Sequence, residues 1–326
     1  MEEGKDMSHC AFNKFFKTNV PHILEKIFMY LDYEAFKSCI QVNKTWNDLL
    51  KSESMQKKAK SMLFEEITED EMKLWHASRM GEAWEVKMLL SSSMLDINFA
   101  DDIHKTTPLI RAAENGHEDV VSCLINNGAD PNVADAHGGN PLHMSAQNGH
   151  KSVVKLLLDG GADPNRADDY GMTSLLWAVD SDIVRLLLEK GAEVNKADED
   201  GETPLHVSAK EGLTSVVKIL LDNGADPSKV DKDALTPLHT AAQEGEAGTV
   251  ELLLERGADP NKADKDGDTP LHIAAMITND HDNGFITFDN KEVVQLLLKW
   301  GADLNKTNNS GYIPRDFRVV QLILGE

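Results

Sequence analysis

Four histidines end the same four-residue phrase at different points of the chain, and their imidazole rings are the first candidates for metal chemistry. They are His143, His206, His239 and His272, each preceded by Pro-Leu and by a Thr or an Asn. Neutral imidazole is a common ligand for zinc, but a zinc site needs three or four ligands in one cluster. Successive histidines stand 63, 33 and 33 residues apart. Each therefore belongs to a separate structural unit, and we expect these histidines to be structural.

A second candidate for metal binding is the segment 280–286, Asp-His-Asp-Asn-Gly-Phe-Ile, which resembles part of a calcium-binding loop. Such a loop has Gly at its sixth position, with oxygen ligands, many of them carboxylates, at fixed positions around it. With the Gly of this segment in that place, the ligand positions hold Asn279, His281, Asn283 and Asn290. Too little negative charge remains for a hard cation, so we interpret the segment as a solvated loop.

No other motif indicates catalysis. The sequence lacks a Gly-x-Ser-x-Gly nucleophile turn, a His-Glu-x-x-His zinc motif and the glycine-rich loops that bind nucleotides. Its three cysteines, Cys10, Cys39 and Cys123, lie far apart without Cys-x-x-Cys spacing, which favours a reducing compartment over disulfides or zinc. We therefore predict a non-catalytic protein with no metal and no cofactor.

The elements that position the histidines follow from an internal repeat. The phrase Thr-Pro-Leu-His, intact or altered, begins at Thr107, Asn140, Thr173, Thr203, Thr236 and Thr269. The intervals are 33, 33, 30, 33 and 33 residues, and a fixed period of this length is typical of stacked supersecondary units. Each unit continues through Ala-Ala and Val-Val-x-Leu-Leu-Leu to Gly-Ala-Asp-x-Asn, with variations. Residues 71–326 thereby resemble ankyrin repeats, which implies an all-α solenoid.

The resemblance implies structural roles within each repeat. The Thr and His of the phrase bond to nearby backbone, and the Pro starts the first helix. Full repeats are expected to begin near residues 102, 135, 168, 198, 231 and 264, giving six between a degenerate opening repeat and a shortened closing one. The repeat 168–197 lacks three residues between Val179 and Ile183, which predicts a tight turn between its helices. The last full repeat has 11 additional residues near 277–290, which predicts an extended loop.

The N-terminal residues follow a different pattern. We expect residues 1–18 to be a disordered tail, because they are polar and without periodicity. Residues 19–56 carry a proline suited to a first helical turn, an apolar helical stripe and two further short apolar segments. The residues that form this pattern are Val20, Pro21, Leu24, Ile27, Phe28, Leu31, Phe36, Val42 and Trp46. So short a segment cannot bury this surface alone, which predicts a covering partner.

This pattern resembles an F-box, because the Pro, the aliphatic stripe, the Val and the Trp follow in that family's order. The resemblance implies a three-helix module that docks on the Skp-type adaptor of a cullin–RING ubiquitin ligase, with the nine residues facing the adaptor or forming the core. Val20 and Asn43 depart from the Leu and Cys frequent in the family, but neither change removes the apolar face. The alternative is a cap of helices that shields the first repeat.

The charge of the chain narrows the class of partner. The net charge is −22, and residues 61–326 hold 47 Asp or Glu against 23 Lys or Arg. An acidic surface argues against nucleic acid as a partner and favours a basic protein segment, although the charge also serves solubility.

Residues 57–70 are expected to be a charged helical connection, since they are not rich in the Gly and Ser of a flexible linker. With neither a secretory signal nor an apolar run near the roughly 20 residues of a membrane span, we expect no membrane contact and a cytoplasmic location, with the nucleus as an additional one.

Ankyrin arrays usually bind ligands on a concave face, to which the residue after the Thr-Pro-Leu-His phrase contributes. Across the repeats this position holds Arg111, Met144, Trp177, Val207, Thr240 and Ile273. With Tyr170 at a neighbouring loop tip and acidic loop residues around it, this face predicts a substrate segment with a large apolar anchor and basic flanks. The alternative is that Trp177 fills the space left by the three-residue deletion.

These features predict an all-α protein that combines an N-terminal F-box-like module with an ankyrin solenoid. The function they favour is that of the substrate-recognition subunit of an SCF-type cullin–RING E3 ubiquitin ligase, monomeric within a hetero-complex. The alternative is an ankyrin interaction scaffold without a link to ubiquitin. The two hypotheses differ in whether the apolar stripe of residues 20–46 is exposed in the free chain.

Overall fold

The computed structural model describes residues 69–92, 95–276 and 290–325. The predicted tail, the F-box-like module, residues 57–68 of the connection and the insertion at 277–289 lie outside these ranges. Within them the chain is helical and contains no β-strand, apart from an isolated bridge between Ala167 and Thr173. The predicted all-α ankyrin solenoid is confirmed for this part of the chain.

The helices follow one another in pairs. The first helices of the pairs are α6 (Glu69–Met80), α8 (Pro108–Glu114), α10 (Pro141–Gln147), α12 (Ser174–Trp177), α14 (Pro204–Lys210), α16 (Pro237–Glu244) and α18 (Pro270–Met276). The second helices are α7 (Ala83–Ser92), α9 (Glu118–Asn126), α11 (Lys151–Asp159), α13 (Ser181–Glu189), α15 (Thr214–Asp222), α17 (Ala247–Glu255) and α19 (Lys291–Lys299). The array closes with η2 (Pro314–Asp316) and α20 (Arg318–Leu324). Glu69 and Asp70, expected in the connection, form the first turn of α6.

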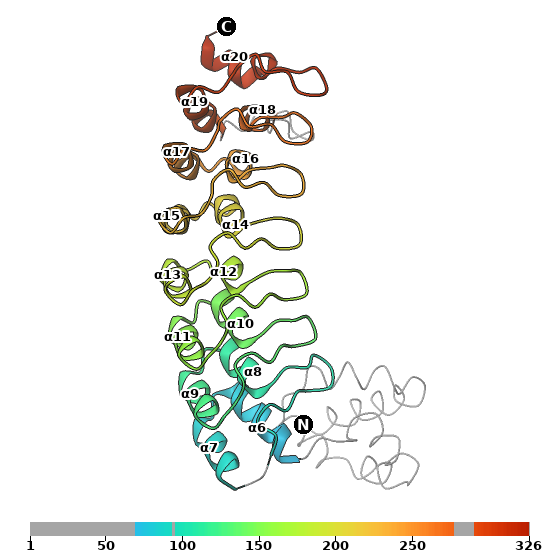
Figure 1. Ribbon diagram of the computed structural model, residues 1–326, viewed down its shortest axis with the longest axis vertical. Coiled ribbons are helices and arrows are strands. Elements are labelled where there is room, and N and C mark those ends of the chain that lie inside the picture. The colour runs from blue at the N-terminus through green and yellow to red at the C-terminus, as the bar shows by residue number, and fades with distance from the viewer. Residues whose placement is uncertain (1–68, 93–94, 277–289, 326) are drawn as a thin grey trace, which may run out of the picture. The chain divides into compact units, whose positions relative to one another are not determined.

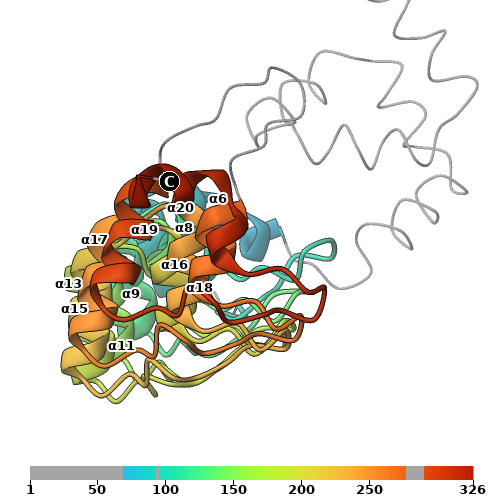
Figure 2. The ribbon, with the colours of Figure 1, turned by 90° about the horizontal axis from the view of Figure 1, so that it is seen from above.

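The pairs stack so that every first helix contacts the first helices of its neighbours, as α10 contacts α8 and α12. Figure 1 shows first and second helices in two columns, with the loops between repeats projecting on the side of the first helices. Figure 2, which looks along the stack, shows these loops aligned with one another. The first helices and the loops therefore share one continuous face.

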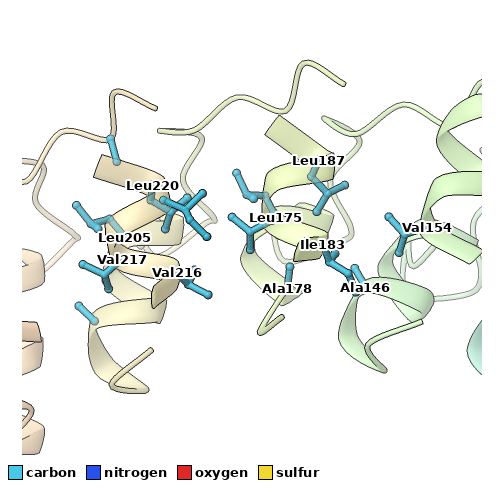
Figure 3. Packing of buried hydrophobic residues seen from close by; sticks show 14 of the residues in the cluster. Ala146, Val154, Leu175, Ala178, Ile183, Leu187, Leu205, Val216, Val217 and Leu220 are labelled. Atoms are coloured by element: carbon cyan, nitrogen blue, oxygen red, sulfur yellow. The ribbon is translucent and has the colours of Figure 1, made fainter. Parts of the chain in front are cut away.

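One apolar core runs through the whole stack, from Leu74 in α6 to Val320 in α20. Leucines and valines of the second helices fill it, and buried alanines such as Ala146 and Ala178 let the first helices approach closely. Figure 3 shows this packing around α12, where Leu175 and Ala178 lie near Ile183 and Leu187 of α13. Because each pair completes its core only with its neighbours, the stack holds the face in a fixed register.

The four phrase histidines are structural, as expected, and each joins two repeats. His239 is fully buried, its Nδ1 accepts from the backbone N–H of Thr236 at 3.0 Å, and its Nε2 lies 3.2 Å from the carbonyl oxygen of Asp268 in the next loop. A carbonyl can only accept, so the proton resides on Nε2 and the ring is neutral. The same pair of contacts recurs at His143, His206 and His272.

The asparagines of the Gly-Ala-Asp-x-Asn segments form a second set of links between repeats. Asn165, for example, donates its side-chain amide to the carbonyl of Gly191 at 2.9 Å and accepts from the backbone N–H of Glu193 at 2.7 Å. Asn132, Asn195 and Asn261 make the same two contacts with the repeat that follows. Ser228 occupies this position in its own repeat, and among the described residues its hydroxyl bonds to Asp226 of the same loop and not to the next repeat.

The tips of the loops are joined through the backbone. The N–H of Asp169 donates to the carbonyl of His137 at 3.0 Å, and the N–H of Glu199 donates to that of Tyr170 at 2.9 Å. This close approach requires glycine: at Gly138, which has φ +79°, an added Cβ would lie 2.7 Å from the backbone nitrogen of Asp169. Residues at the tips are thereby fixed relative to the loops on either side.

The buried histidines make stability depend on pH. Burial lowers the pKa of His143 and His206, and lowers that of His239 to about 4. In the unfolded chain a histidine binds a proton near pH 6.5, so the unfolded state takes up protons first as the pH falls. The stabilisation is therefore complete above pH 6.5 and is lost between about 6.5 and about 4, by about 3 kcal/mol for His239 alone.

Urea denaturation of the natural chain and of His239→Gln, followed by circular dichroism at pH 7.5 and pH 5, tests this expectation. Glutamine remains neutral, so the variant should be less stable at pH 7.5 but should lose less stability on acidification. An equal loss in both chains would contradict the role assigned to the neutral ring.

The missing asparagine link gives a second expectation for stability. Ser228→Asn should add contacts to the carbonyl of Gly257 and the N–H of Asp259, as its counterparts do in the other repeats, and should raise the free energy of unfolding by about 1 kcal/mol. The matched reverse change, Asn195→Ser, should lower it by a similar amount. The urea midpoints of both variants measure the effect, and a shift of the same sign in both would refute it.

Candidate protein-binding face

The six residues predicted to face a partner occupy the same position in successive first helices. Each is the fourth residue of its helix, from α8 to α18, so together they form one row across the stack. Arg111, Met144, Trp177, Val207 and Ile273 are partly exposed in this row. Thr240 is the exception, because it is buried and its hydroxyl donates to the carbonyl of Pro237 at 2.9 Å. It offers no side chain to a partner, which corrects the expectation at that position.

Trp177 is the last residue of α12 and lies against the loop that precedes its own helix. Its indole Nε1 donates to Oδ2 of Asp168 at 3.3 Å. The other oxygen of this carboxylate accepts from the backbone N–H groups of Tyr170 and Met172, both at 2.9 Å. Tyr170 is 61% exposed at the tip of the same loop. Asp168 therefore fixes the backbone of the loop at Tyr170 and the indole of Trp177 relative to each other.

Arg111 lies nearer the N-terminal end of the row and is restrained on two sides. Its guanidinium lies 5.0 Å from the ring centroid of Trp75, and its Nη1 donates to Glu114 at 2.8 Å. The Trp75 indole in turn donates to the carbonyl of Thr106 at 3.0 Å. A guanidinium stacked on a desolvated ring is held by cation–π attraction, so Arg111 links the first two helix pairs.

The three-residue deletion changes a helix rather than a turn alone. We expected a tight turn between its helices, and the structure shows in addition that α12 has only four residues, whereas α10 and α14 have seven. The chain leaves α12 in an extended conformation at Ala178, and Asp180 then caps α13 by accepting from the N–H groups of Asp182 and Ile183. Val179, in this extended link, is 54% exposed.

The acidic residues of the loops divide into two groups. The first acidic residue of each loop holds the turn, as when Oδ1 of Asp198 accepts from the N–H groups of Asp200 and Glu202, both at 2.9 Å. Asp135, Asp168, Asp231 and Asp264 make the same pair of contacts. Among the acidic residues further along each loop, Asp200 pairs with Lys232 at 3.2 Å and Asp233 pairs with Lys265 at 3.3 Å.

Glu202 differs from these loop carboxylates. It is partly buried, and no ion pair to its carboxylate occurs within the described ranges. Burial raises the pKa of Glu202, the nearby Asp198, Asp231 and Asp200 act in the same direction, and Lys210 opposes them. A positive group placed at Glu202 would relieve this unfavourable burial of charge.

Sequence reasoning missed two members of this face, Val179 and Glu202. Val179 could have been found by assigning the deletion to the end of the first helix. Glu202 could have been found from its position immediately before Thr203, where the other loops have Thr, Gly, Met, Leu, Asp or Tyr. Its partial burial, however, depends on how the loops pack.

Neither metal nor membrane chemistry is visible in the described part of the chain. It contains no cluster of three or more His, Cys, Asp and Glu side chains arranged to hold an ion. No described helix is long and apolar enough to cross a bilayer. The residues predicted to face an adaptor, from Val20 to Trp46, lie outside the described ranges.

Comparison with known proteins identifies both parts of the chain. Ankyrin repeats match at 53–135, 74–168, 119–198, 161–231 and 205–308, and an F-box domain matches at 20–58. A similar solved structure is the ankyrin repeat domain of Bcl-3, described as a unique member of the IkappaB protein family. It is 28% identical, with a TM-score of 0.56 over 62% of this chain and 92% of that one.

No curated protein matches the chain in the corresponding sequence search. The ankyrin matches alone extend over more than half of the 326 residues, and the stacked helix pairs agree with them. The chain belongs to the ankyrin-repeat family and carries an F-box domain at residues 20–58.

Proposed function

We propose that this protein is the substrate-recognition subunit of an SCF-type cullin–RING ubiquitin ligase. The observation that carries the proposal is the F-box domain at 20–58 beside an ankyrin array in one chain. An F-box implies docking on a Skp-type adaptor, and ankyrin repeats are protein-binding modules. This combination is typical of non-catalytic adaptors, with the ubiquitin transfer performed by other subunits.

The adaptor would be bound by the apolar residues of the F-box. The residues proposed for this role are Val20, Pro21, Leu24, Ile27, Phe28, Leu31, Phe36, Val42 and Trp46. A surface of this composition gains free energy from burial against another apolar surface, at about 25 cal/mol per Å². It is therefore suited to a stable rather than a transient interface.

The substrate would be bound by the face that the first helices and the loops share. Its partly exposed row of Arg111, Met144, Trp177, Val207 and Ile273 lies on a stack whose register is held by the histidine and asparagine links. A rigid surface loses little conformational entropy on binding, which favours specific recognition. Its acidic loops favour a basic protein segment and disfavour nucleic acid.

The experiment that tests this proposal is capture of purified Skp-type adaptor and cullin by the full-length chain. The double variant Pro21→Ala, Leu24→Ala removes part of the proposed apolar face, and we expect captured adaptor to fall about 10-fold or more, which corresponds to 1.4 kcal/mol or more. Tyr312→Ala, at an exposed loop position of the last repeat, is the control and should capture as much adaptor as the natural chain.

Circular dichroism establishes that each variant keeps its helical content. If the natural chain is folded and captures neither adaptor nor cullin, the ligase role is wrong. The protein would then be an ankyrin scaffold in which residues 20–58 serve another purpose.

A further inference from the structure

The repeat that contains α12 departs from its neighbours in three ways, each of which weakens its first helix. Ser174 replaces the proline that begins the other first helices from α8 to α18, and its buried hydroxyl has no hydrogen-bond partner. Leu176 occupies the position of the linking histidine, so Thr173 lacks the capping contact present at Thr203. The deletion then removes the last turn. Proteins commonly depart from the sequence preferences of a regular helix at positions that serve a function.

The altered helix, the loop before it and the link after it carry three apolar side chains that are partly or largely exposed. Asp168 accepts from the backbone N–H of Tyr170 and from the indole of Trp177, so the loop backbone at Tyr170 and the Trp177 side chain are held by the same carboxylate. Val179 follows Trp177 by two residues, which places the two Cα atoms within about 7 Å of each other. A regular first helix would continue at this point, as α14 does through Lys210. The missing turn therefore leaves Val179 54% exposed, two residues along the chain from the partly exposed Trp177.

The stretch of sequence that contains these residues carries an excess of negative charge. Residues 168–202 contain ten Asp or Glu and three Lys or Arg. Lys190 pairs with Asp159 outside this stretch at 2.6 Å, whereas Lys151 and Lys232 pair with Asp182 and Asp200 at 2.8 and 3.2 Å, so the negative excess is reduced but not removed. Glu202 belongs to the next loop of the array, whose backbone is joined to that of the Tyr170 loop by the bond from the N–H of Glu199 to the carbonyl of Tyr170. A partner segment that carries an apolar side chain next to a Lys or Arg would therefore complement these residues.

We propose that Tyr170, Trp177, Val179 and Glu202, here called the α12 surface, bind an extended basic segment of a partner protein. A large apolar side chain of that segment packs on Trp177 and Val179, where a regular repeat would place its own last helical turn. A Lys or Arg beside it reaches the carboxylate of Glu202. This inference rests on the proposed function in so far as the segment belongs to the ligase substrate, but the surface itself is independent of the F-box.

The test uses the full-length chain and fluorescein-labelled peptides of about 12 residues, which span about 40 Å when extended. The first probe has a central Trp between pairs of Arg on a Gly-Ser background. A second probe replaces Arg by Glu, and a third replaces Trp by Ala. We expect fluorescence polarisation to show that the first probe binds at least about 10-fold more tightly than the other two, a difference of about 1.4 kcal/mol.

Substitutions assign the binding to the α12 surface. Glu202→Gln should weaken the first probe several-fold, and Val179→Asp, at an exposed position, should weaken it about 10-fold, because a charge replaces the apolar contact. Insertion of Ser-Ala-Lys after Trp177, copied from 208–210, restores a full first helix and should abolish the difference between the first and third probes. Val230→Ser, at an exposed site in the following repeat, is the matched control and should bind as the natural chain does.

Three results would overturn the proposal: no binding of the first probe up to about 1 mM, equal binding of all three probes, or unchanged binding by both Val179→Asp and Glu202→Gln. Capture of the Skp-type adaptor is measured on the same preparations. Adaptor capture without peptide binding would reject the α12 surface alone, whereas peptide binding without adaptor capture would reject the ligase role alone.

Discussion

The structure depends on the fact that no helix pair of this array can bury its own apolar surface. Each pair has two exposed flanks, and the leucines, valines and alanines on those flanks become core only when a neighbour covers them. Buried polar groups depend on the neighbouring repeat in the same way. The His239 ring satisfies a backbone N–H of its own repeat and a carbonyl of the next, so a displaced neighbour would leave a buried polar group without a partner. Stacking order, loop register and the position of the binding face are consequences of this one constraint.

The same constraint explains why an irregular repeat can be tolerated in the middle of the array. The short α12 retains Leu175, Leu176 and Ala178 in the core, and α13 retains Ile183, Val184 and Leu187, so the contacts with both neighbours persist. What the repeat has lost is its proline, its linking histidine and a helical turn on the exposed side. Neighbouring repeats supply the stability that this one lacks, which leaves its surface free to differ.

The repeated phrase, through its resemblance to ankyrin repeats, was sufficient to predict the helix pairs, the structural histidines and the row of residues on the first helices, because these follow from one family pattern applied repeatedly. Deviations from the pattern were harder to predict. A three-residue deletion can shorten either a turn or a helix, and the choice depends on whether Ala178 and Asp180 can keep the core filled and α13 capped. Thr240 turns inward because its hydroxyl bonds to Pro237, and Arg111 is held by Trp75, which lies 36 residues away.

The composition of the array overstates the number of acidic side chains that are available to bind a partner. Much of the acidic character of the loops is structural, since the first Asp of each loop holds its turn through backbone N–H groups, and Asp200 and Asp233 are paired with lysines of the following loop. Net charge along the whole face would attract any basic protein at long range and would be screened by salt. Selectivity must therefore come from the few carboxylates that the fold does not already use, placed next to an apolar contact. Glu202 beside the shortened α12 meets both conditions, so one exceptional repeat, rather than the charge summed over the array, is the feature that can distinguish one basic partner from another.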